Sequence, residues 1–237
     1  MISIIGKIYI IILGASLWAC SSHLVLHQVP SNVAISKEIS GDSILQSFIK
    51  PYSDSLAKSM NQIIAYSDQN FIIERPCSNL MNWSADALLA HETRNVKLSQ
   101  PVFCLLNTGG LRSGLNKGAI TVGDMFKLMP FDNLVAWVQL PVTALPQIAY
   151  YLEQSGGEPI ANARLENGKL NINGLNDTHE FVWLITSDYL ATGGDKMQFF
   201  KLANSIQIKS STLRSVFIEE AQIQGNLISN SEKRIIR

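Results

Sequence analysis

The segment "PVFCLLNTGGLR", residues 101–112, joins a continuous apolar run to a polar glycine turn. A short apolar run that ends at a turn is typical of a strand buried on both faces of a sheet. Two adjacent glycines relax the backbone where the run ends, so main-chain N–H groups can approach a ligand closely. The segment therefore predicts an interior strand that delivers a binding loop.

Helical and strand patterns alternate on both sides of this segment. Helices are predicted where apolar residues recur at helical spacing, at residues 42–64, 78–92, 145–152 and 212–224, and a capping-box spacing opens a shorter one at residues 121–124. Strands are predicted at residues 31–41, 133–140, 179–187, 197–203 and 205–209, and Asn167-Gly168 indicates a hairpin. Because no regular strand–helix–strand repeat appears, the sequence predicts an α+β fold, a single domain at residues 42–237 with a mixed β-sheet flanked by helices.

The charge balance limits the class of ligand. The chain has 237 residues, of which 19 are basic and 19 acidic, so its formal net charge is +0. A protein that binds nucleic-acid polymers through their phosphates normally carries a basic excess, and we therefore exclude that class of partner. A small anionic ligand stays compatible with this composition, because a few local groups suffice to bind it.

The first 19 residues have the pattern of a signal peptide. Lys7 precedes an apolar run at residues 8–19, which is too short to span a bilayer. The run ends at Ala19, and the following Cys20 resembles the lipidated cysteine of a bacterial lipobox. We therefore expect Cys20 and a tether at residues 20–41, which includes the first strand, to anchor the protein to a membrane on the periplasmic side of the cell envelope. The alternatives are ordinary signal cleavage and an uncleaved anchor.

Cys77 and Cys104 are the two other cysteines of the chain. In an oxidising envelope they can pair, and as buried residues they can equally stay free thiols. Neither belongs to a metal-type spacing of cysteines and histidines, so the sequence predicts no metal site in this chain.

The turn after the first strand carries polar groups suited to a sugar phosphate. Gly109 and Gly110 relax the backbone, and Arg112 adds a fork of donors that matches phosphate or carboxylate. Asn107 can donate and accept hydrogen bonds at once, which suits a sugar hydroxyl or a phosphate oxygen. The alternative is a plain glycine turn with a surface arginine ion pair, and these six residues alone favour that alternative.

A second glycine turn, "DYLATGGDK" at residues 188–196, makes a binding site the better interpretation. Gly193 and Gly194 relax the backbone before Asp195, whose carboxylate can accept two vicinal ribose hydroxyls. Tyr189, together with Phe131 in the loop "LMPFDN", offers flat rings that can stack on a nucleobase. The alternative for both rings is core packing, which is the more common environment of an aromatic side chain.

Three motifs, "NTGGLR", "ITVGDMFKLMPFDNLV" and "TSDYLATGGDKMQFF", together resemble the C-terminal domain of bacterial and animal 5′-nucleotidases and UDP-sugar hydrolases. The segment "SNLMNWSADAL" is similar to a helix of that family, with Asn82 and Asp86 at its characteristic positions. The resemblance covers residues 42–237. It implies that Phe131 and Tyr189 enclose the base, that Asp195 binds ribose hydroxyls, and that Asn107 and Arg112 contact the ribose–phosphate side.

The chain departs from the family in its hydrolytic half. The resemblance implies a separate two-metal phosphoesterase domain with several histidines, whereas this chain has four in all, at positions 23, 27, 91 and 179. Thr108 replaces a glycine of the first motif, and Arg75 lies near a family arginine without matching its spacing.

These departures lead to two functional hypotheses. In the first, the chain is the nucleotide-binding half of a 5′-nucleotidase, and a separate metallophosphoesterase chain supplies divalent metals and hydrolyses nucleoside 5′-phosphates. In the second, the chain is a stand-alone envelope lipoprotein that binds nucleotides or nucleosides without catalysis. A third possibility is a scaffold that has lost its ligand.

Overall fold

The computed structural model describes residues 41–236 of a chain that divides into two units, residues 1–48 and 49–237. The predicted signal peptide, Cys20 and the strand expected at residues 31–41 lie, apart from Gly41, outside the described residues. Helix α2 (Ser43–Met60) ends earlier than the expected helix at residues 42–64, because Ile63 already belongs to strand β1 (Ile63–Ser67). No helix within residues 41–236 has the length and apolar character needed to cross a bilayer.

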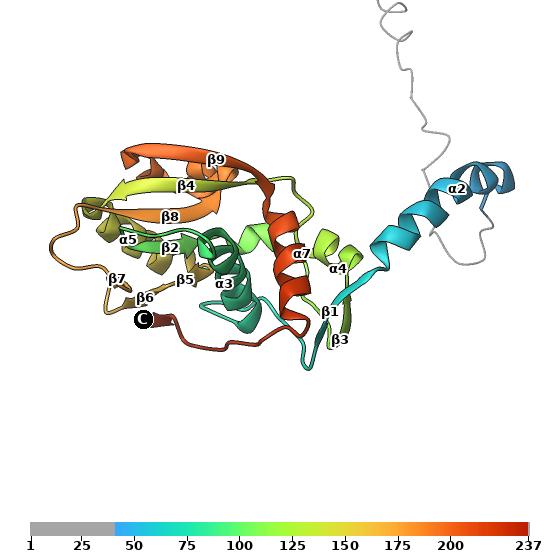
Figure 1. Ribbon diagram of the computed structural model, residues 1–237, viewed down its shortest axis with the longest axis horizontal. Coiled ribbons are helices and arrows are strands. Elements are labelled where there is room, and N and C mark those ends of the chain that lie inside the picture. Colours follow the sequence, from blue (N-terminus) through green and yellow to red (C-terminus); the bar gives the residue numbers. More distant parts are fainter. Residues whose placement is uncertain (1–40, 237) are drawn as a thin grey trace, which may run out of the picture. The chain divides into compact units, whose positions relative to one another are not determined.

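A five-stranded sheet forms the centre of the second unit (Figure 1). Its strands lie in the order β5 (Ile160–Ala161), β2 (Val102–Leu105), β8 (Phe181–Ser187), β4 (Leu134–Pro141) and β9 (Ser205–Thr212). Strands β2 and β8 are parallel, and the other pairs are antiparallel. The expected α+β fold with a mixed sheet is therefore confirmed.

Strand β2 contributes side chains to two hydrophobic clusters, one on each face of the sheet. Successive side chains of a strand point to opposite faces, so Val102 and Cys104 join one buried cluster while Phe103 and Leu105 join another. Helices α3 (Asn79–Thr93), α4 (Val122–Leu128) and α7 (Leu213–Gln224) contribute to the first cluster. Helix α5 (Leu145–Ser155) and the hairpin of β6 (Ala163–Glu166) and β7 (Lys169–Ile172) contribute to the second. Both faces of the strand are covered, as a continuous apolar run requires.

Local sequence signals account for several boundaries. Ser78 caps α3 through its side chain, and Thr121 and Asp124 form the expected capping box of α4, which follows strand β3 (Gly118–Thr121). The hairpin between β6 and β7 turns at Asn167 and Gly168, which both have positive φ, as a two-residue hairpin turn requires.

The strand expected at residues 197–203 is wrong, because this segment forms the 3₁₀ helix η4 (Gln198–Leu202). Phe199 and Phe200 are both buried in one cluster, with their ring centroids 4.7 Å apart. A strand would send adjacent side chains to opposite faces. A helical turn lets both rings enter the same core.

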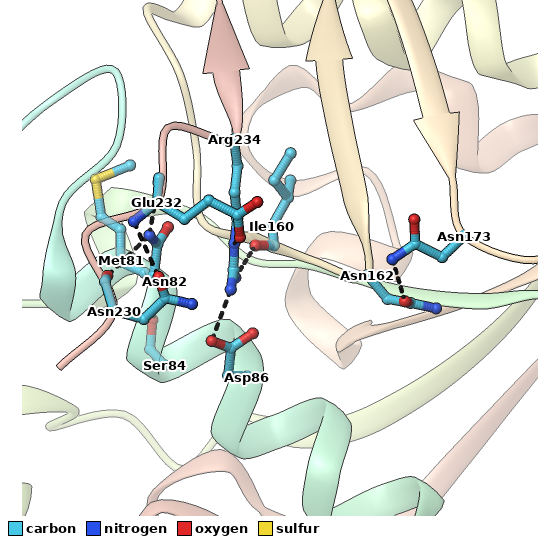
Figure 2. A network of polar contacts seen from close by, with 10 residues as sticks. All are labelled: Met81, Asn82, Ser84, Asp86, Ile160, Asn162, Asn173, Asn230, Glu232 and Arg234. Atoms are coloured by element: carbon cyan, nitrogen blue, oxygen red, sulfur yellow. Dashed lines mark hydrogen bonds and ion pairs between the residues drawn. The ribbon is translucent and has the colours of Figure 1, made fainter. Parts of the chain in front are cut away.

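The C-terminal segment is held against α3 by the polar network in Figure 2. Arg234 is buried, and its guanidinium donates to Oδ2 of Asp86 and to the carbonyl of Ile160, both at 2.7 Å. The side-chain amide of Asn82 donates to the carbonyls of Asn230 and Glu232, each at 2.9 Å. Asn82 and Asp86, two residues of the family-like helix, therefore anchor residues 230–234, and strand β10 (Ile235–Ile236) then pairs with β6.

Both cysteines of the described part are free thiols, so of the two alternatives the unpaired state is the one observed. Cys104 is fully buried in β2, and this burial raises the pKa of its thiol well above the ordinary value.

Candidate functional site

A cavity of about 370 Å³ lies where the two glycine turns meet. Its volume falls within the range of small-molecule sites. Its lining consists of Asn107, Gly109, Gly110, Arg112, Phe131, Asn133, Tyr189 and Asp195. Seven of the nine residues predicted from the sequence thus line one cavity, although they come from three separate segments of the chain. The other two, Gly193 and Gly194, do not line it.

The first turn follows β2 and forms the short 3₁₀ helix η1 (Thr108–Gly110). The main-chain N–H of Gly110 donates to the carbonyl of Asn107 at 3.1 Å, and that of Thr108 donates to Glu158 at 2.6 Å. These two amides bind within the protein, which corrects the expectation that they face a ligand. The side chains of Asn107 and Arg112 are instead the polar groups that this turn presents to the cavity.

An ion pair between the half-exposed Arg75 and the buried Glu158 supports the first turn. The carboxylate of Glu158 is almost fully buried, and Arg75 donates to it at 2.6 Å and also to the hydroxyl of Thr108. Burial raises the pKa of Glu158, although the Thr108 N–H and the Arg75 charge act in the opposite direction. Arg75 and Thr108, where the chain departs from the family pattern, thus contact each other outside the cavity lining.

The second turn follows the short helix α6 (Asp188–Ala191) and depends on both of its glycines. Gly193 has a φ of 95°, which a side chain would strain. A Cβ atom on Gly194 would lie 2.6 Å from ring atoms of Tyr189. The two glycines therefore allow Asp195 to fold back against Tyr189 without lining the cavity themselves.

The carboxylate of Asp195 accepts a hydrogen bond from one residue of each glycine-turn segment. The hydroxyl of Tyr189 donates to its Oδ1 at 2.8 Å, and the amide of Asn107 donates to its Oδ2 at 2.5 Å. The hydrogen bond to Asp195 also raises the pKa of Tyr189. A carboxylate has about four acceptor sites, and these two bonds use half of them. Asp195 can therefore still accept two ligand hydroxyls.

Phe131, which lies in a loop, and Tyr189, which lies in α6 rather than in a loop, are both half-exposed at the cavity. Residues Phe131 and Tyr189 are 41% and 46% exposed, so the core-packing alternative does not describe them. The guanidinium of Arg112 lies 5.9 Å from the ring centroid of Phe131, within cation–π range. The cavity therefore combines flat apolar faces with one cation and one carboxylate.

Asn133 is the lining residue that the sequence reasoning missed. It follows Phe131 by two positions and directly precedes β4. Its place directly before a strand and in the same loop as Phe131 was the available sequence signal.

The histidines of the described part lie away from this cavity. His91 in α3 contacts Glu92 and Glu219, and His179 accepts a hydrogen bond from the main chain of Asn176. Within residues 41–236, no group of three or more His, Cys, Asp or Glu side chains is arranged to hold a metal ion.

A larger cavity, of about 660 Å³, lies elsewhere, between α5 and the segment from Gly168 to His179. Its lining includes none of the residues in the two glycine turns. We take the smaller cavity as the candidate site because three sequence motifs converge on it.

The structure is an α+β domain with a cavity of polar and aromatic residues at its two glycine turns. Residues 56–141 match the family model described as 5′-nucleotidase, C-terminal domain. The trifunctional nucleotide phosphoesterase protein YfkN of Bacillus subtilis is 25% identical over 211 residues, which make up 75% of this chain and 14% of that protein. Over residues 56–141 the chain is therefore similar to the C-terminal domain of 5′-nucleotidases.

Solved structures agree on the fold. A 5′-nucleotidase precursor from Thermus thermophilus has a TM-score of 0.64 at 21% identity, over 81% of this chain and 42% of that one. The NAD nucleotidase of Haemophilus influenzae has a TM-score of 0.57 at 17% identity, over 82% of this chain and 41% of that one. The chain thus spans less than half the length of each of these proteins.

Proposed function

We propose that this domain binds a nucleoside 5′-phosphate in the 370 Å³ cavity. The convergence of Phe131, Tyr189, Arg112 and Asp195 on one cavity carries this proposal. The two rings stack on the base, which is worth about 1–3 kcal/mol per stacked base. Asp195 accepts the ribose hydroxyls, and Asn107 and Arg112 bind the ribose–phosphate side through directed and charge-assisted hydrogen bonds.

We further propose that hydrolysis takes place on a separate metallophosphoesterase chain. Such a chain would supply two metal ions to polarise the phosphate and generate the attacking hydroxide, and within residues 41–236 of the present chain no group of three or more His, Cys, Asp or Glu side chains could hold a metal ion. In this arrangement the present domain binds and orients the nucleotide. Orientation alone is valuable, because a phosphate held in line with the nucleophile reacts as if intramolecular.

The test measures AMP hydrolysis, with divalent metal present, by this chain, by the candidate phosphoesterase and by their mixture. We expect the mixture to be faster than the phosphoesterase alone. Adding the Phe131→Ala variant instead should abolish the gain, whereas Arg164→Ala, which alters an exposed ion pair on β6, should preserve it. A mixture no faster than the phosphoesterase alone would contradict the two-chain proposal.

The alternative proposal is a stand-alone nucleotide-binding protein without catalysis. The complete cavity and the lack of a metal-binding group within residues 41–236 favour it over an autonomous hydrolase. It requires AMP or adenosine to bind the purified domain without changing any partner's kinetics. Calorimetry with AMP tests binding directly, and a flat titration that Asp195→Ala and Phe131→Ala leave unchanged would indicate a scaffold without a ligand.

We also propose that Cys20 is lipidated and anchors the chain in the cell envelope. The support is the lipobox-like end of the apolar run at residues 8–19. Metabolic labelling with a fatty acid should mark the wild-type protein and not the Cys20→Ala variant, which should also leave the membrane fraction. Equal labelling of both proteins would contradict lipidation at Cys20.

A further inference from the structure

The loop at residues 129–133 carries Phe131 and Asn133, which line the cavity. Residues at the start of α7 donate hydrogen bonds to the main chain of this loop. One nitrogen of Arg214 donates to the carbonyl of Met129 at 3.1 Å and to that of Phe131 at 3.2 Å. A second nitrogen of Arg214 forms an ion pair with Asp132. The preceding residue, Leu213, donates its main-chain N–H to the carbonyl of Asn133 at 2.9 Å. Every residue of this loop except Pro130 is thus bound by two consecutive residues of α7.

Arg214 itself is held in place. Its side chain is only 13% exposed, and its guanidinium lies 4.1 Å from the ring centroid of Phe126. Thr212 caps the helix by accepting the main-chain N–H of Ser215, which fixes the backbone around Arg214. A planar guanidinium keeps its donors in a rigid fork, so its position determines where the bound carbonyls lie.

A different residue, Asp188, fixes the position of Tyr189, which carries the second ring. The carboxylate of Asp188 accepts the N–H of Leu134 at 3.1 Å and that of Tyr189 at 2.7 Å. Asp188 therefore links the start of β4 to the residue that carries the second ring. Of the two rings, Phe131 is the one whose loop depends on Arg214.

We propose that Arg214 is a positioning residue for nucleobase recognition, which holds the ring of Phe131 at the cavity without touching the ligand. This inference rests on the proposed function of the cavity. Without the guanidinium, the carbonyls of Met129 and Phe131 lose their donor and the loop gains freedom. Stacking then weakens, whereas Asp195 and Asn107 keep their geometry because Arg214 contacts neither of them, and Arg112 loses only the Phe131 ring beside its guanidinium.

Two ligands separate positioning from general damage to the cavity. AMP carries a base, a ribose and a phosphate, whereas ribose 5-phosphate lacks the base. We expect Arg214→Ala to weaken AMP binding about tenfold, the equivalent of losing one stacking contact. Binding of ribose 5-phosphate, measured by competition, should fall clearly less than that of AMP, because ribose 5-phosphate has no base to stack on Phe131 and loses only the support that this ring gives to Arg112.

The experiment compares wild type, Arg214→Ala, Arg214→Lys and Arg164→Ala. Arg214→Lys keeps the charge without the rigid fork and should give an intermediate loss of AMP affinity. Arg164→Ala removes an exposed arginine on β6 and should match wild type. Amide hydrogen exchange should be faster at residues 129–133 in Arg214→Ala, with exchange in β2 unchanged.

The outcomes distinguish the two proposals. Equal AMP affinity in wild type and Arg214→Ala would overturn the positioning role, and so would an equal loss for AMP and ribose 5-phosphate. If wild type binds neither ligand, the proposed function of the cavity fails. Hydrogen exchange then decides the remaining claim, since unchanged exchange at residues 129–133 in Arg214→Ala would show that Arg214 does not hold the loop.

Discussion

The side-chain amide of Asn107 donates to the carboxylate of Asp195 at 2.5 Å, across 88 positions of sequence. This bond joins the two glycine turns directly. The hydroxyl of Tyr189 occupies the other carboxylate oxygen, so Asp195 is fixed in orientation before any ligand arrives. Fixing an acceptor in advance lowers the entropy lost when a ligand binds.

Asn107→Asp should reverse the attraction between the two turns. It places two carboxylates within hydrogen-bond distance, and like charges in one site cannot both ionise without cost. We expect AMP affinity at neutral pH to fall about tenfold or more, with partial recovery in acid as one carboxyl becomes protonated. Calorimetry at two pH values measures this. Asn176→Asp, a matched change in an exposed turn, is the control, and equal affinities for all three proteins would refute the bridging role.

Tyr189→Phe and Tyr189→Leu should separate the ring of Tyr189 from its hydroxyl. Phe keeps a stacking face and loses only the two hydrogen bonds that the hydroxyl makes with Asp195, so we expect AMP affinity to fall about two- to fivefold. Leu also removes the aromatic face, so the free energy of AMP binding should weaken by a further amount of about 1–3 kcal/mol. Calorimetry with AMP compares the two variants, and an equal loss in both would exclude a stacking role for this ring.

Gly194→Ala should disturb the second turn through a direct clash. Its Cβ atom would lie 2.6 Å from Tyr189 ring atoms and from the Tyr189 carbonyl, and overpacking of this kind costs about 1–3 kcal/mol. Gly193→Asn is the informative comparison, because the space there is open and asparagine tolerates positive φ. Gly194→Ala should lower both the melting temperature and the AMP affinity more than Gly193→Asn does. The opposite ranking would show that the positive φ at Gly193 constrains this turn more than the limited space at Gly194.

Arg234→Met should destabilise the fold through its C-terminal segment. It removes the hydrogen bonds to Asp86 and to the Ile160 carbonyl, at an expected cost of about 1–3 kcal/mol in the free energy of unfolding. Arg164→Met is the matched control, since Arg164 pairs with Glu232 at 4.0 Å with both side chains about half exposed. Such exposed pairs contribute about 0–1 kcal/mol. Denaturant titrations that give equal losses for both variants would contradict the anchoring role of Arg234.

Tyr151 should make stability depend on alkaline pH. Burial, followed by the nearby charge of Glu158, raises the pKa of Tyr151 to about 12. An unfolded tyrosine ionises at about 10, so between these values the folded state holds a proton that the unfolded state has lost. The contribution of Tyr151 to the free energy of unfolding is therefore complete below about pH 10 and is lost as the pH rises towards 12.

Chemical denaturation at a series of alkaline pH values tests this. Tyr151→Phe should flatten the fall in stability over that window, because phenylalanine has no proton to lose. Tyr150→Phe, an exposed neighbour in α5, is the control. Parallel profiles for wild type and Tyr151→Phe would show that Tyr151 does not contribute.

Local signals predicted most of the elements, because each depends on a few neighbouring residues. The cap at Ser78, the capping box at Thr121 and the hairpin at Asn167 are signals of this kind. The position of β8 between β2 and β4 could not be predicted from local signals, because it depends on packing between segments far apart in sequence. The same holds for Arg234, whose contacts lie 74 and 148 positions away.

In the candidate site too, residues within local motifs could be predicted from the sequence, whereas long-range contacts could not. Glycine turns, an arginine and two aromatic residues identified seven of the eight residues around the cavity, because each motif implies its own chemistry. The bridge from Asn107 to Asp195 and the support from Arg214 could not be predicted, since both join residues more than 80 positions apart in the sequence. Sequence patterns predicted the groups that face the cavity better than the groups that hold them in place.

The strand order has a practical consequence for protein fragments. The family match ends at residue 141, after β2 and β4 but before β8, which hydrogen-bonds to both of them. A polypeptide limited to residues 56–141 would leave unpaired the edges that β8 normally fills, and such edges promote aggregation. Expression trials that follow the boundaries of the family match should therefore yield insoluble material, and boundaries for recombinant work need to reach at least the final strand.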